Sequence, residues 1–94
     1  MDSSDHERLV RYYREEAARL AADSGWHSAL AVQYGAKRVS GPEAELWGAL
    51  AAYSLLLASY ELNAAKVMLA LAGVHAQPGL SAAPQPFGKQ QGPP

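Results

Sequence analysis

The chain has 94 residues, which accommodates one small domain, and it contains no cysteine, which excludes a disulfide framework and thiolate metal sites. The formal charge is −1, and Lys37 and Arg38 are the one pair of adjacent basic residues, so the basic surface of a nucleic-acid binder is absent. Domains of this size bury about 60 to 65% of the surface that their unfolded chains expose, so we expect a partner or self-association to add stability.

The N-terminal segment MDSSDHERLV is charged and lacks the apolar core and the cleavage site of a signal peptide, so we expect a cytoplasmic protein. Up to about residue 75 the chain is dominated by Ala, Leu, Glu and Arg, and it shows no β-branched alternation. These features predict an all-α domain over residues 1–75, in the form of a small antiparallel helical hairpin or bundle.

A first helix is expected to begin at Ser4, which has capping-box spacing to Glu7. Charges of alternating sign at every fourth position predict a solvated face, formed by Glu7, Arg11, Glu15 and Arg19. The opposite face predicts a core stripe, formed by Leu9, Tyr13, Ala17 and Leu20.

The sequence DSGW is expected to end this helix, because Ser24 can cap a following helix and Gly25 weakens continuation. A second helix is then expected from Trp26 to about Arg38. The next boundary is VSGPEAELW, where Ser40 and Glu43 have capping-box spacing and Pro42 suits a first helical turn.

The stretch from Leu46 to Val74 is apolar or small almost throughout, but it carries Glu61, Asn63 and Lys66. A membrane span is not expected, because the uncharged run from Leu46 holds only 15 residues, where about 20 are needed. Two explanations remain open. Residues 42–74 form one long helix at the centre of a homodimeric bundle, or a turn near Ser59 starts another helix with Glu61 in its first turn.

Aromatic spacing favours the turn. A shift of 34 residues brings Tyr13 onto Trp47 and Trp26 onto Tyr60, and small residues recur in both halves, at Ala17, Ala29, Ala36, Ala51 and Ala70. This pattern resembles the tetratricopeptide repeat, with Trp47 to Ala51 matching its opening motif and Ser54 and Asn63 departing from it. The resemblance implies two helix-turn-helix units in which Trp26 and Trp47 anchor the core.

A narrower resemblance covers residues 16–58. The segments EEAARL, SGWHSALA and EAELWGALAAYSLLLAS are similar in order to the small tetratricopeptide-like chaperones that hold needle subunits in type III secretion. This resemblance implies a cytoplasmic chaperone or adaptor that cradles an amphipathic helix of its client.

The repeat geometry implies a groove between the first helices of the two units, where a partner helix would bind. The expected partner-binding residues are Arg11, Arg14, Ala18, Ala52, Leu55 and Leu56. The Arg residues would meet acidic side chains of the partner, and the others its apolar side.

Catalysis is not expected. His6, His27 and His75 lie in separate predicted elements without metal-ligand spacing, and capping explains Asp23 and Ser24 beside His27. Nothing in the sequence points to a metal or a cofactor. The predicted function is a non-enzymatic protein-protein interaction module, either an adaptor or chaperone for an amphipathic helix or a self-associating structural subunit.

Residues 76–94 change composition. Five of the six prolines lie between Pro78 and Pro94, among Gly, Gln and Ser. Such a segment lacks the apolar content to offset its ordering entropy, so a disordered tail that includes Phe87 is expected.

Overall fold

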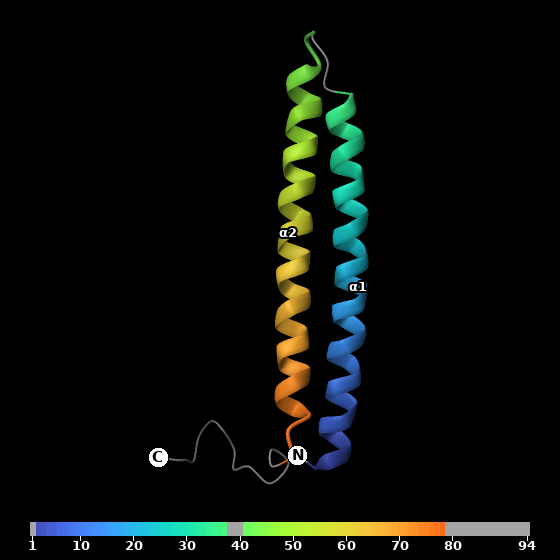
Figure 1. The fold of residues 1–94 in the computed structure, drawn as a ribbon, viewed down its shortest axis with the longest axis vertical. Helices are drawn as coiled ribbons and strands as arrows, with labels where there is room; N and C mark the ends of the chain where they lie inside the picture. Colours follow the sequence, from blue (N-terminus) through green and yellow to red (C-terminus); the bar gives the residue numbers. More distant parts are fainter. Residues whose placement is uncertain (1, 38–40, 79–94) are drawn as a thin grey trace, which may run out of the picture.

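The computed structural model describes residues 2–37 and 41–78. Within them the chain forms two α-helices, α1 (Ser3–Ala36) and α2 (Ala44–His75), which run antiparallel side by side (Figure 1). At 1.5 Å per residue each helix is about 50 Å long. The start of α1 and the end of α2 share one end of the hairpin, called here the His75 end, and the opposite end is the Trp47 end. The predicted all-α antiparallel hairpin is confirmed.

The N-terminus of α1 is capped by Asp2, two residues earlier than the sequence suggested. The Asp2 side chain accepts a hydrogen bond from the Asp5 backbone N–H (2.9 Å), and the Asp5 side chain accepts one from the Asp2 N–H (3.4 Å). This reciprocal pair is a capping box, so the predicted box of Ser4 and Glu7 is wrong. The hydrogen bond from Asp5 lowers the pKa of the Asp2 carboxyl.

The predicted break at DSGW does not occur, since α1 continues through Ser24, Gly25 and Trp26. A glycine inside a helix costs about 1 kcal/mol relative to alanine, which packing of a long helix can offset. Ser24 is buried against α2 rather than capping a new helix. The expected second helix from Trp26 is therefore the second half of α1.

The second helix begins at Ala44. Its N-cap is Glu43, whose side chain makes no capping hydrogen bond, so Glu43 does not take the third helical position that the predicted capping box gave it. Ser40, the other residue of that box, lies outside the described residues. Gly41 precedes it with φ of 122°, a conformation that favours glycine, and Pro42 lies in the turn rather than in the first helical turn.

Helix α2 passes through Ser59 without a turn. The predicted long helix over residues 42–74 is therefore confirmed, with bounds Ala44–His75, while the homodimeric bundle stays a prediction. Two helix-turn-helix units would need four helices, whereas the described residues form two, so Glu61 lies in mid-helix and not in a first turn. Phe87 and the rest of the expected tail beyond Pro78 lie outside the described residues.

The two helices meet along a seam of small residues, which repeat every seven positions. The buried residues of this seam are Ala17, Ser24 and Ala31 on α1 and Ala58, Ala65 and Ala72 on α2. On α2 the series extends back through the half-buried Ala51 and Ala44. A seven-residue repeat is the signature of a coiled coil, and alanine in place of the usual large residue lets the helix backbones approach closely.

The expected faces of α1 are confirmed. Ala17 is buried and the rest of the predicted core stripe is half-buried, while all four members of the charged ladder are exposed. Arg19 forms ion pairs with Glu16 (2.7 Å) and Asp23 (3.2 Å), neither of which belongs to that ladder. The Arg19 side chain lowers the pKa of the Glu16 carboxyl. Trp26 is 63% exposed, so the expectation that it anchors the core is wrong.

Candidate interaction surface

The alanine seam leaves the large side chains of α2 outside the hairpin. A second stripe, called here the free stripe, runs along α2 at alternating steps of four and three residues. It consists of Leu46, Leu50, Tyr53, Leu57, Tyr60, Ala64, Val67, Leu71 and Val74. Steps of four and three are the spacing of a coiled-coil contact, so α2 carries two such contact lines and α1 covers one of them.

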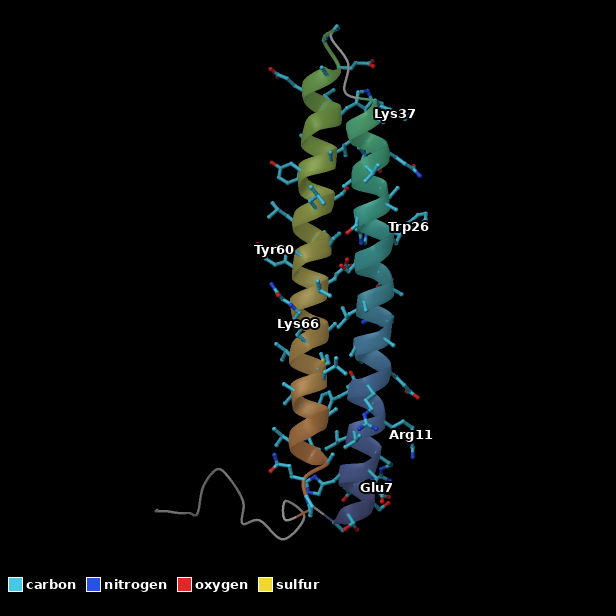
Figure 2. All side chains as sticks on the ribbon, in the orientation of Figure 1. Glu7, Arg11, Trp26, Lys37, Tyr60 and Lys66 are labelled. Atoms are coloured by element: carbon cyan, nitrogen blue, oxygen red, sulfur yellow. The ribbon has the colours of Figure 1, made fainter. Side chains whose placement is uncertain are left out.

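Seven of the nine residues of the free stripe are exposed, and Ala64 and Leu71 are half-buried. Tyr53 and Tyr60 are each 68% exposed and Leu46 is 66% exposed. The tyrosine ring of Tyr60 points away from α1 (Figure 2). No charged residue interrupts the stripe between Leu46 and Val74, so it forms a continuous apolar line about 42 Å long at 1.5 Å per residue.

The line of α2 that faces α1 runs midway between the alanine series and the half-buried series that includes Glu61. The free stripe lies about 100° around the helix axis from this line when positions are projected at 3.5 residues per turn. Lys66 lies on neither line and is exposed (Figure 2). Asn63 is exposed as well. The polar residues that interrupt the apolar sequence of α2 therefore do not interrupt its free stripe.

Glu61 faces α1 rather than solvent. One of its carboxylate oxygens lies 2.8 Å from His27 Nδ1, and the two side chains retain 14% and 25% of their exposure. A carboxylate in the seam is thus hydrogen-bonded by an imidazole of the opposite helix, as buried polar groups require. Sequence analysis missed this pairing because the two residues lie 34 positions apart.

A second cross-helix pair closes the His75 end. His6 is 8% exposed, and its Nδ1 lies 2.8 Å from Nδ1 of His75. The ring of Tyr13 stacks on His75 with centroids 5.8 Å apart. An open hollow of about 630 Å³ adjoins this pair and is also lined by Arg11 and Arg14.

Aromatic residues close the Trp47 end. The rings of Tyr34 and Trp47 have centroids 6.1 Å apart, and Lys37 Nζ lies 5.5 Å from the Trp47 centroid. A lysine at this distance over an indole makes a cation–π contact worth about 0.5 to 1 kcal/mol at an exposed site. Trp47, unlike Trp26, therefore contributes to the helix contact.

The predicted partner-binding residues do not form one groove, although all six are exposed. Arg11 and Arg14 adjoin the hollow at the His75 end. The Ser24 to Ala58 contact sets Leu55 at the level of His27, which is 13 residues, or about 20 Å, along α1 from Arg14. Ala18 lies one turn from Arg14 on α1, whereas the members on α2 (Ala52, Leu55 and Leu56) belong to another part of the hairpin.

Comparison with protein-family models, with curated proteins and with solved structures found no match. Within the described ranges, no group of three or more His, Cys, Asp or Glu side chains is placed to hold a metal ion.

Helix α2 is long and apolar enough to cross a membrane by length and composition alone, with a mean hydropathy of 1.4 over its best window. Only 17% of that window is buried within the hairpin. The core helix of a water-soluble protein meets the same criteria, so length and composition alone do not identify a membrane span.

Proposed function

We propose that this chain is a non-enzymatic protein-protein interaction subunit, in which the free stripe of α2 packs against another helix. The single observation that carries the proposal is the uninterrupted apolar line from Leu46 to Val74 on the side of α2 that α1 leaves open. A helix that is apolar around most of its circumference is normally buried in a larger assembly.

The hairpin alone buries little that would hold it together. Its buried hydrophobic residues are all alanines, and no large side chain is fully buried among the described residues. Burial of apolar surface contributes about 25 cal/mol per Å², so small side chains supply a weak core. Packing of a further helix on the free stripe would bury the leucines and tyrosines that the alanine seam cannot.

A lipid bilayer is a poorer cover than another helix. Helix α1 lies beside α2 along its whole length and carries charged residues throughout its first two thirds. If α2 crossed a membrane in this hairpin, those charges would enter the hydrocarbon at about 2.5 to 3.5 kcal/mol each near its centre. The contact is therefore proposed to form in water, in keeping with the expected cytoplasmic location.

Hydroxyl-radical footprinting tests the proposal. Tyr53 and Tyr60 report on the free stripe, and Tyr12, 53% exposed on α1, is the internal reference. The chain is labelled alone and with an added 28-residue peptide that carries leucine at heptad positions a and d. We expect Tyr53 and Tyr60 to be labelled more slowly than Tyr12 in at least one of the two samples. Full labelling of both residues in both samples would contradict the proposal.

A further inference from the structure

We propose that the helix that covers the free stripe belongs to a second copy of this chain, with the two α2 helices antiparallel and crossing at Tyr60. This inference rests on the proposed function and names the partner. It follows from the chemistry of the stripe, from its angle to the line of α2 that faces α1, from its length and from the order of its side chains.

The free stripe is free of charged side chains, which suits pairing with a second copy of itself. In a twofold contact the stripe pairs with itself, so any charged residue in it would approach a like charge on the partner. The nine stripe residues include no charged side chain. A stripe adapted to a client with a charged edge would carry opposite charges within it, because interfaces select partners by such pairing.

The angle between the free stripe and the line of α2 that faces α1 matches that of a four-helix bundle. In a four-helix bundle each helix touches two neighbours about a quarter turn apart. The free stripe lies about 100° from the line of α2 that faces α1, as the heptad projection gives. Two hairpins that meet through their α2 helices therefore have the arrangement of a bundle core.

The free stripe is large enough to form a dimer interface. Seven of the stripe residues are large apolar side chains that remain 43 to 68% exposed. If each loses on the order of 80 Å², two copies bury roughly 1,100 Å², above the about 1,000 Å² expected of a biological interface. A single helix of this length thus suffices for a dimer.

The order of the side chains along the stripe sets the direction. Both tyrosines and three of the four leucines lie among its first five residues, and its last four residues are Ala64, Val67, Leu71 and Val74. An antiparallel pair centred on Tyr60 places Tyr53 opposite Val67 and Leu46 opposite Val74, with Leu57 one residue from Ala64 and Leu50 near Leu71. Tyr60 then meets Tyr60 of the second copy, as it would in a parallel pair. A parallel pair would instead set Tyr53 against Tyr53 and Ala64 against Ala64. Large side chains facing small ones fill an interface, whereas the parallel arrangement alternates crowding with voids.

Cysteine crosslinking tests the inference, because the natural chain contains no cysteine. Three single variants of the full chain are compared, Tyr60→Cys, Leu46→Cys and Ser59→Cys, with a short bismaleimide. Light scattering reports the mass of the unmodified chain. We expect twice the chain mass of 10.0 kDa and at least tenfold more crosslinked dimer for Tyr60→Cys than for Leu46→Cys or Ser59→Cys. Mixing Leu46→Cys with Val74→Cys should restore crosslinking.

Each other outcome overturns the inference in a distinct way. Equal crosslinking of Leu46→Cys and Tyr60→Cys indicates a parallel pair, and preferential crosslinking of Ser59→Cys indicates another face of α2. A monomer whose Tyr53 and Tyr60 become protected by the leucine peptide overturns the second copy but leaves the proposed function standing. A monomer without such protection overturns both.

Discussion

The hydroxyl of Ser24 donates a hydrogen bond to the backbone carbonyl oxygen of Ala58, with 2.7 Å between the two oxygens. The two residues are 8% and 5% exposed, and each belongs to the seven-residue repeat of its helix. A hydroxyl on so short a side chain reaches the opposite backbone only where the helices approach closely. This contact therefore fixes the register, placing Ala17 opposite Ala65 and Ala31 opposite Ala51.

Enlarging Ser24 should damage the hairpin more than removing its hydrogen bond. Ser24→Ala loses one neutral hydrogen bond and should lower the free energy of unfolding by about 0.5 to 1.5 kcal/mol. Ser24→Leu forces a larger side chain into the closest part of the seam and should cost more, about 1 to 3 kcal/mol or beyond. Urea denaturation followed by circular dichroism measures both, and a Leu variant as stable as the Ala variant would disprove close packing at Ser24.

Gly25→Ala should stabilise the protein. A Cβ built at Gly25 meets no atom within 4 Å, and the residue lies in the interior of α1. Alanine is favoured over glycine there by about 0.8 to 1 kcal/mol, which should raise the thermal midpoint. Gly41→Ala is the matched control and should destabilise by about 1 to 2 kcal/mol, because its φ of 122° strains any side chain. A loss of stability in Gly25→Ala would indicate that α1 breaks at this position.

Glu61→Ala should destabilise the hairpin by leaving His27 without its partner inside the seam. A hydrogen bond to a charged group contributes about 1.5 to 3 kcal/mol, toward the lower end here because both side chains keep some exposure. Glu61→Gln keeps an acceptor for the imidazole and should cost less. Lys66→Gln is an exposed control on the same helix and should change the free energy of unfolding by less than about 0.5 kcal/mol. Equal effects of Glu61→Ala and Lys66→Gln would refute the contact.

Local patterns in the sequence were sufficient to predict the helical class and the faces of α1. Charges at every fourth position placed Arg11 and Glu15 in solvent, and Ala17 in the core, because these patterns depend only on helix periodicity. The seven-residue alanine series from Ala44 to Ala72 is also visible in the sequence, and it was the signal that could have revealed the seam.

Helix boundaries were predicted less well than the helix faces, for a physical reason. Gly25 and Ser24 have low intrinsic helix propensity. A break there would avoid a cost of about 1 kcal/mol but would lose the packing of half a helix. The same holds at Ser59 and Asn63, where turn-forming residues lie within a continuous α2. The contacts of His6 with His75 and of Glu61 with His27 depend on the register of two distant segments, which no local pattern contains.

The central claim is that α2 is one helix whose single register sets both the alanine seam and the free stripe. Insertion of two glycines between Ala58 and Ser59 tests it most directly, with helicity measured by far-ultraviolet circular dichroism. Two residues in a helix interior cost about 1 kcal/mol each and rotate everything after them by about 200°. That rotation would remove Ala65 and Ala72 from the seam, so we predict a cooperative loss of helical signal. Helicity and thermal midpoint close to those of the parent would contradict the claim, because they would mean that the chain tolerates a turn at Ser59.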